Sequence, residues 1–168
     1  MRLRRPWWHG TLHGARLSTN CELGVFVGGA GAEFAASRLL VDKTRPQQSD
    51  HWVGRGLEVQ DLARIDLAGA HIVGNRVAGL FSAHGVVRVV GTTIANTATN
   101  GAFSLGGPGL WLDAGSSGSI AACSVRDNQA LAVGMDGSTL QIVASVLSGT
   151  ALGKYPELGS DGQLRGCS

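Results

Sequence analysis

The sequence has little of what would place it in several common protein classes. Only four of its 168 residues are proline, nine are aromatic and 15% are charged. It contains no run of about 20 apolar residues, so we expect no membrane-spanning segment. The net charge of +2 is too small to favour nucleic acid as a partner. No window shows a clear apolar stripe with a 3.6-residue period, so helices should be minor.

Cysteine is also scarce, and its three positions form no recognisable pattern. Cys21 and Cys167 lie near the two ends, whereas Cys123 falls within an apolar segment. No CxxC or Cys/His spacing indicates zinc, and we expect neither a metal nor a cofactor. The redox state of the three thiols stays open. The basic start MRLRRPWWHG is not followed by the apolar segment of a signal peptide, so no export signal is visible.

Glycine is abundant, and it clusters between short apolar segments. The chain has 26 glycines, about twice the usual share of roughly 7%. The segment Ala130–Thr150 shows the arrangement clearly: two short apolar steps flank a glycine-containing turn, and a third step follows. One such unit could not bury its apolar side alone, so we searched the chain for internal repeats.

The unit recurs with a nearly constant period. We align the copies on a small residue that is followed by an aliphatic residue two places later and by Asn, Asp or Thr five places later. The spacings between successive aligned positions are 22, 33, 22, 31 and 22, which indicates a base period of 22 with two enlargements. The aligned positions are Ala15, Ser37, Ala70, Thr92, Cys123 and Ser145.

Apolar and polar positions alternate with a period of two before each aligned position, which predicts half-buried strands. A further strand with the pattern G-[LV]-x-[LV] precedes them. Its inward ladders should be Val25, Leu57, Leu80, Leu110, Leu131 and Val27, Val59, Ser82, Leu112, Val133. A polar row is predicted at a turn, where its side chains could bond to backbone or to one another. Its members are Asp42, Asn75, Thr97, Asn128 and Thr150.

This repeat resembles the right-handed parallel β-helix of the pectate-lyase-like superfamily over roughly residues 10–150. The expected fold class is therefore all-β, a solenoid with about 22 residues per coil and five to six coils. The resemblance implies a secreted or cell-surface location and contact with polysaccharide. Two other architectures stay open. A pentapeptide-type helix fits IDLAGAHIVGNRVAG, although the spacing does not persist beyond about three pentads. A leucine-rich repeat would need a recurring Asn in an LxxLxL frame and a helical return segment, and neither is present.

We divide the chain into an irregular lead-in (residues 1–9), a repeat domain (10–150) and a C-terminal tail expected to be coil (151–168). Two insertions, residues 43–55 and 98–108, enter at the same place in the repeat. They should project from one edge of the solenoid, where binding often resides. The ends lack a recognisable cap, so we expect either that the lead-in and tail act as lids or that the chain is a fragment of a longer β-helix. Uncapped ends would permit end-to-end self-association.

The outward row of the glycine-led strand is the candidate binding surface. It should comprise Phe26, Glu58, Phe81, Trp111 and Ala132. Its three aromatic rings could stack on sugar rings or simply shield the sheet. His51 and Trp52 of the first insertion are added as possible ligand-binding residues.

A polysaccharide-cleaving enzyme is the competing hypothesis. Its candidate catalytic residues are Glu58, Asp113, His84 and Arg55. A glycosidase needs two carboxyl groups that face one bond, and a calcium-dependent lyase needs an acidic cluster, which the repeats lack. Arg55 and His84 are more readily explained as a loop charge and an exposed turn residue. We therefore expect a non-catalytic protein that presents a surface for polysaccharide or cell-envelope binding.

Overall fold

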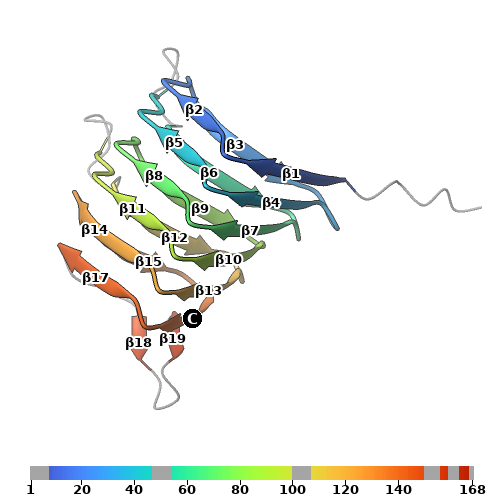
Figure 1. The fold of residues 1–168 in the computed structure, drawn as a ribbon. Coiled ribbons are helices and arrows are strands. Elements are labelled where there is room, and N and C mark those ends of the chain that lie inside the picture. Colours follow the sequence, from blue (N-terminus) through green and yellow to red (C-terminus); the bar gives the residue numbers. More distant parts are fainter. Residues whose placement is uncertain (1–7, 47–53, 100–106, 150–155, 159–162, 167–168) are drawn as a thin grey trace, which may run out of the picture.

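The computed structural model describes residues 8–46, 54–99 and 107–149, together with the strands at 156–158 and 163–166. Every regular element in this part of the chain is a β-strand, and the strands form three sheets (Figure 1). Sheet A contains, in spatial order, β1 (His9–His13), β4 (Glu33–Ser37), β7 (Arg64–Ala68), β10 (Val86–Val90), β13 (Ser117–Ala121), β16 (Thr139–Val143), β19 (Gln163–Gly166) and β18 (Pro156–Leu158).

The other two sheets are entirely parallel. Sheet B contains β17 (Val146–Gly149), β14 (Ser124–Asn128), β11 (Thr93–Ala95), β8 (His71–Val73), β5 (Leu40–Asp42) and β2 (Arg16–Ser18). Sheet C contains β15 (Val133–Met135), β12 (Leu110–Asp113), β9 (Leu80–Ala83), β6 (Arg55–Gln60) and β3 (Leu23–Gly28).

The chain visits sheets A, B and C in turn, and each visit adds a parallel strand beside the previous one. Three successive strands make one coil, so coil 1 is β1–β3, coil 2 is β4–β6, and coil 6 is β16–β17. The predicted fold is therefore confirmed: the protein is a parallel β-helix of about six coils. Within the described residues, no helix could span a membrane.

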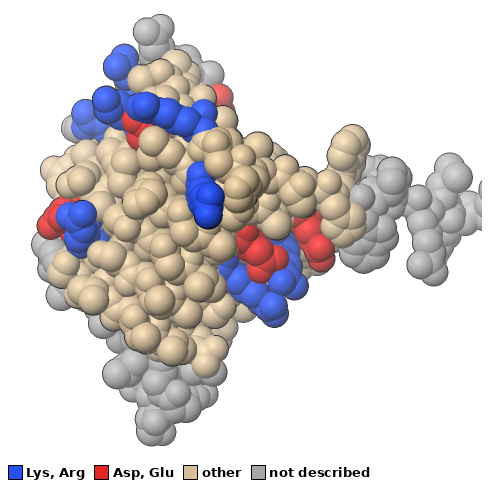
Figure 2. Space-filling model, in the orientation of Figure 1, with Lys and Arg blue, Asp and Glu red and all other residues tan. Residues whose placement is uncertain are grey.

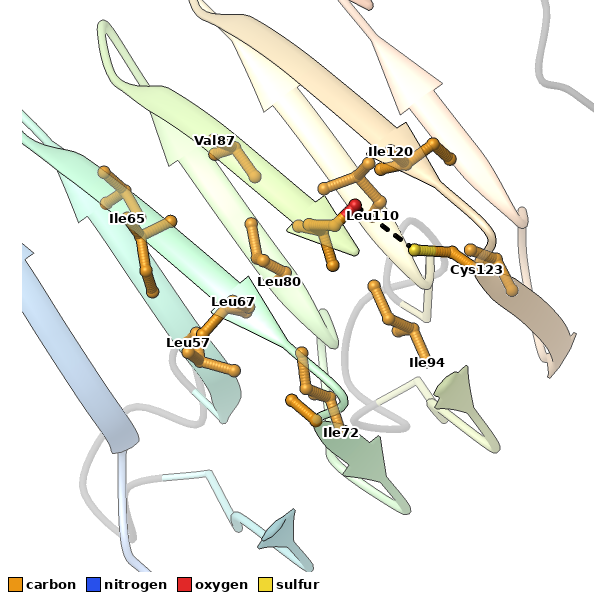
Figure 3. Close-up of a cluster of buried hydrophobic side chains, with 14 of the residues drawn as sticks. Leu57, Ile65, Leu67, Ile72, Leu80, Val87, Ile94, Leu110, Ile120 and Cys123 are labelled. Carbon is orange, nitrogen blue, oxygen red and sulfur yellow. Dashed lines mark hydrogen bonds between the residues drawn. The ribbon is translucent and has the colours of Figure 1, made fainter. Parts of the chain in front are cut away.

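The core fills the space enclosed by the three sheets. Inward aliphatic side chains from equivalent positions stack coil upon coil, as Leu57, Leu80 and Leu110 do from sheet C (Figure 3). Each of these three is fully buried, and such burial contributes about 1.5–3 kcal/mol per side chain. Cys123 is a buried free thiol at the edge of this core, and its sulfur donates a hydrogen bond to the Val89 carbonyl at 3.4 Å.

A tight bend joins sheet A to sheet B in every coil, and one residue of the bend is left-handed. These residues, with φ between 46° and 62°, are Gly14, Arg38, Gly69, Gly91, Ala122 and Ala144. Glycine adopts this conformation without steric cost, whereas a residue with a Cβ does so at a cost of about 1–2 kcal/mol. The regular coil therefore imposes the bend even where the sequence supplies alanine or arginine.

A polar ladder runs along the connection from sheet B to sheet C. Its members alternate between asparagine in odd coils and threonine in even coils: Asn20, Thr44, Asn75, Thr97 and Asn128. The Asn75 side chain accepts a hydrogen bond from the Thr44 backbone N–H at 3.0 Å and donates one to the Val41 carbonyl at 3.3 Å. Asn128 binds Thr97 N–H and the Ile94 carbonyl in the same way. Each of these two asparagines therefore secures the backbone of the preceding coil.

The alternation reflects a repeat of two coils. The spacing from Thr44 to Thr97 is the same as that from Asn75 to Asn128, because short and insertion-bearing coils alternate. Both insertions leave the solenoid where sheet B connects to sheet C, and residues 47–53 and 100–106 within them lie outside the described residues.

The predicted register is wrong by two residues in coil 2. Leu39, not Ser37, lies at the small-residue position, and Thr44 takes the ladder position predicted for Asp42. Two extra residues between β3 and β4 displaced the alignment. A shift of two preserves which side chains point inward, so the apolar pattern could not reveal it.

Coil 5 shows the same kind of error in its sheet C strand, β15. Val133 and Met135, not Leu131 and Val133, pair with Leu110 and Leu112. Asn128 pairs with Gly149 through an irregular register, and Thr150 lies outside the described residues.

The C-terminal tail also differs from its prediction as coil. It contains β18 and β19, which pair with each other in antiparallel fashion, and β19 pairs antiparallel with β16. The exposed backbone edge of β16 explains this addition, because an unpaired edge strand readily accepts another strand. The tail thus extends sheet A beyond coil 6.

Candidate functional site

The outward stripe on sheet C is the strongest candidate for a binding surface. Register pairs Phe26 with Glu58, Glu58 with Phe81, and Phe81 with Trp111, so these side chains follow one another across adjacent strands. Adjacent strands lie about 4.8 Å apart, which puts Phe26 and Trp111 roughly 14 Å from each other. We call these four residues, with Gly134 after them, the sheet C stripe.

The last member of the stripe is Gly134, not Ala132 as predicted. Gly134 pairs with Trp111, whereas Ala132 is buried in the core. A Cβ at position 134 would overlap the indole ring of Trp111, so the ring lies against the glycine backbone. At the end of the stripe, the indole ring of Trp111 therefore packs against the backbone of Gly134 and not against an alanine side chain.

The Phe26 ring likewise packs against the backbone of a glycine, Gly28. A Cβ added at Gly28 would come within 2.6 Å of the tip of the Phe26 ring, so this ring too lies along the sheet over a glycine. Phe26 is 55% exposed, which is unusual for a phenylalanine. The stripe therefore begins and ends with an aromatic ring lying against backbone that carries no side chain.

The middle of the stripe is polar, and it is built around Glu58. This carboxylate is only 4% exposed, and its Oε1 lies 2.7 Å from Nη1 of Arg55. Gln60 Nε2 donates a hydrogen bond to the same oxygen. The Arg55 guanidinium also stacks over Phe81, with its carbon 3.7 Å from the ring centroid. Stacking and ion pairing together fix this side chain against the sheet.

Arg55 is therefore not the loop charge that the sequence suggested. It is the first residue of β6 and pairs with Leu23 of β3. Its Nε is buried and has no hydrogen-bond partner. Nothing in the sequence signalled this role, because Arg55 is the last residue of the polar run assigned to the first insertion.

The other catalytic candidates do not converge on Glu58. Asp113 ends β12 and aligns across the sheet with Gln60, so its Cα lies about 12 Å from that of Glu58, two coils and two residues away. His84 is exposed, with φ of 54°, in the turn between β9 and β10. His51 and Trp52 lie outside the described residues.

No arrangement for metal chemistry is found either. Within residues 8–46, 54–99 and 107–149, no three His, Cys, Asp or Glu side chains are placed together so that they could hold a metal ion. The Glu58 carboxylate is already engaged by a cation and an amide. The stripe can therefore offer stacking faces and hydrogen bonds, and its described side chains contain no pair of facing carboxyl groups.

A second depression lies on the outer face of sheet A, and sequence reasoning missed it. It has a volume of about 700 Å³, and its floor consists of small side chains such as Ala35, Ser37 and Ala68. His13 and Arg88 contribute to its walls, and His13 Nδ1 lies 2.6 Å from the Ser37 hydroxyl. In the observed register Ser37 lies between His13 and Ala68, and Ala35 lies beside Asp66, an arrangement that the shifted alignment of coil 2 did not give.

On the face of the molecule drawn in Figure 2, charged side chains are unevenly spread. Figure 2 shows them gathered around the N-terminal coils and in a mixed group toward β4, β7 and β10, whereas the later coils show a mostly uncharged surface. The mixed group includes the two-pronged pair of Arg64 with Asp66, at 2.7 and 3.0 Å.

Comparison with models of known protein families, with curated proteins and with solved structures finds no match.

Proposed function

We propose that this protein is a non-catalytic β-helix that binds polysaccharide, or a polymer of a cell envelope, along the sheet C stripe. The observation that carries the proposal is the pair of aromatic rings, Phe26 and Trp111, that lie against glycine backbone at the two ends of the stripe. Flat aromatic faces offer a sugar ring a large apolar contact at little cost in side-chain entropy.

The polar centre of the stripe supports a ligand with many hydroxyl groups. Arg55 and Gln60 are partly exposed, and both are held by the buried Glu58 carboxylate, so their remaining donors and acceptors are already oriented for a ligand. An elongated chain that runs across the strands would meet aromatic, polar and aromatic surface in turn. This order suits a polymer better than a compact small molecule.

The resemblance of the repeat to the pectate-lyase-like superfamily supports the same proposal at the level of family. It also supports an extracellular or cell-surface location. No described geometry favours turnover, because Glu58 is held in an ion pair and Asp113 lies about 12 Å from it.

A polysaccharide panel tests the proposal directly. Binding of the full chain should be detected on a glycan array and measured by calorimetry, and Trp111→Ala should weaken it at least about 10-fold, as expected for a truncated aromatic anchor. Val146→Ala is the matched control, because Val146 is an exposed apolar residue of sheet B. Equal effects of the two substitutions, or no binding to any glycan, would overturn the proposal.

Turnover is measured in the same samples by release of reducing ends and by absorbance of unsaturated products. The non-catalytic proposal expects neither signal. Product formation that disappears in Glu58→Gln or Asp113→Asn would establish the enzyme instead.

A further inference from the structure

Within the described residues, coil 1 is the terminal coil at the N-terminal end of the solenoid. β1, β2 and β3 are the first strands of their sheets, and each pairs on one side only within the described chain. The inward side chains Leu17 and Val25 are partly exposed there, whereas their partners one coil later, Val41 and Leu57, are fully buried. We call this end, formed by residues 9–28, the N-terminal face. It is an apolar cross-section of the core bordered by free backbone edges.

This face carries little protection against pairing. Natural edge strands are commonly blunted by charges or proline. The three strands His9–His13, Arg16–Ser18 and Leu23–Gly28 contain no proline, and Arg16 is their only Lys, Arg, Asp or Glu residue. Arg16 is itself bound to Asp42 of coil 2 at 3.1 Å. These strands therefore lack the features that would keep another chain away.

Asn20 provides independent evidence that this face is incomplete. The equivalent amides of Asn75 and Asn128 each donate to a carbonyl of the preceding coil. Asn20 belongs to the same ladder, but its Nδ2 is buried and has no hydrogen-bond partner. A buried amide without a partner costs about 1–3 kcal/mol, so the ladder calls for an acceptor beyond coil 1.

The opposite end cannot supply that acceptor in an undisturbed molecule. There, β19 and β18 continue sheet A past β16, and β19 runs antiparallel to it. These strands occupy the position where β1 of another copy would have to add. Head-to-tail stacking is therefore blocked in sheet A, and the N-terminal face of a second copy is left as the complementary surface.

We infer that two copies of this chain associate through their N-terminal faces around a two-fold axis. Such an axis makes the facing edge strands antiparallel, so that their N–H and C=O groups can pair. It covers both apolar faces at once, and each Asn20 amide, which has no acceptor in its own chain, gains a carbonyl of the other copy once the groups that cover it in the single chain move aside. The face is one whole coil, from His9 to Gly28. It is therefore close in size to a stable interface, to which each partner contributes roughly 20–30 residues.

The test measures the mass of the full chain over a wide range of concentrations by sedimentation and light scattering. We expect a concentration-dependent species of twice the chain mass of 17.3 kDa. Leu17→Lys places a charge on the N-terminal face and should weaken the dimer at least about 10-fold, because a buried unpaired charge is strongly unfavourable. Leu147→Lys is the matched control, since Leu147 fills the same slot in coil 6.

Asn20→Leu is the second variant, and it keeps the test open if Leu17→Lys fails to fold. It should leave folding intact and weaken dimerisation about 2- to 10-fold, the equivalent of one hydrogen bond. A mass of 17.3 kDa at every concentration would overturn the inference. So would masses that grow beyond the dimer, or equal weakening by the Lys substitutions at the two ends.

Discussion

Substitutions in the polar ladder should change stability in opposite directions on neighbouring coils. Asn75 is fully buried, and its amide group satisfies Thr44 N–H and the Val41 carbonyl. Asn75→Leu keeps a similar volume but leaves the Thr44 N–H buried without a partner and removes one hydrogen bond from the Val41 carbonyl, which also lies in the ladder between β5 and β8. An orphaned buried group costs about 1–3 kcal/mol and a lost hydrogen bond about 0.5–1.5 kcal/mol, so we expect a loss of about 1.5–4.5 kcal/mol in the free energy of unfolding.

Thr44→Val should have the opposite effect. Thr44 is also fully buried, but its hydroxyl has no hydrogen-bond partner. Valine has nearly the same shape and removes the unpaired oxygen, which should stabilise the protein by about 1 kcal/mol. Thr97→Val repeats the experiment two coils later, because the Thr97 hydroxyl is likewise buried and unpaired.

Urea unfolding followed by circular dichroism measures both effects, and amide hydrogen exchange locates them. In Asn75→Leu the Thr44 amide should lose protection, whereas in Thr44→Val it should keep it. The reasoning fails if Asn75→Leu lowers the free energy of unfolding by less than about 1 kcal/mol, since a buried N–H without a partner and a lost hydrogen bond should together cost more than that. It also fails if both threonine substitutions destabilise the protein, because the hydroxyls would then have partners in solution.

Three further predictions concern the bends, the pH dependence and the stripe. Gly69→Ala should cost about 1 kcal/mol in thermal or urea unfolding and Ala122→Gly should regain up to about 1 kcal/mol, because both residues are left-handed and the space at Gly69 is open; equal signs would refute this. The hydrogen bond from Ser18 and the Arg16 ion pair hold the pKa of Asp42 below its ordinary 3.8, so its stabilisation exists above that pH and is lost as the pH falls below about 4. The stability gap between the wild type and Asp42→Asn should therefore narrow from pH 7 to pH 3. Gly134→Ala should displace the indole beside it and weaken glycan binding while leaving urea stability nearly unchanged; unaltered affinity would contradict the packing assigned to Trp111.

The fold was predictable because small and apolar residues recur with a constant period and alternate with polar residues along each strand. The register was predictable only where the coil length is constant. Two additional residues follow Gly28 before coil 2 begins, and in coil 5 a leucine and an alanine precede Val133, so shifted alignments satisfied the same alternation. Only backbone pairing distinguishes the alternatives. That is why Thr44 and Met135 were missed.

For the candidate site, the row of aromatic residues was predictable, but the packing of their rings and of the neighbouring side chains was not. Phe26, Phe81 and Trp111 follow from the period alone. The packing of the rings against glycine and the position of Arg55 depend on which strand lies beside which, and a single sequence carries no direct information on that. The pairing of the tail with β16 was unpredictable for the same reason, since it depends on an edge that exists only after the coils have stacked.

The two-coil repeat bears on how such a protein could diversify. Each insertion departs just after a ladder threonine, and the asparagine of the next coil binds the backbone at that point, as Asn75 does at Thr44 and Asn128 at Thr97. The base of each loop is thus fastened by a residue outside the loop. The sequence and length of a loop can then change while the hydrogen bond from the asparagine side chain to the backbone at its base is kept. A duplication of two coils would add one loop together with the asparagine that holds its base. The two insertions therefore lie two coils apart along the solenoid, a spacing of about 10 Å, and each can vary without disturbing the coils that carry it.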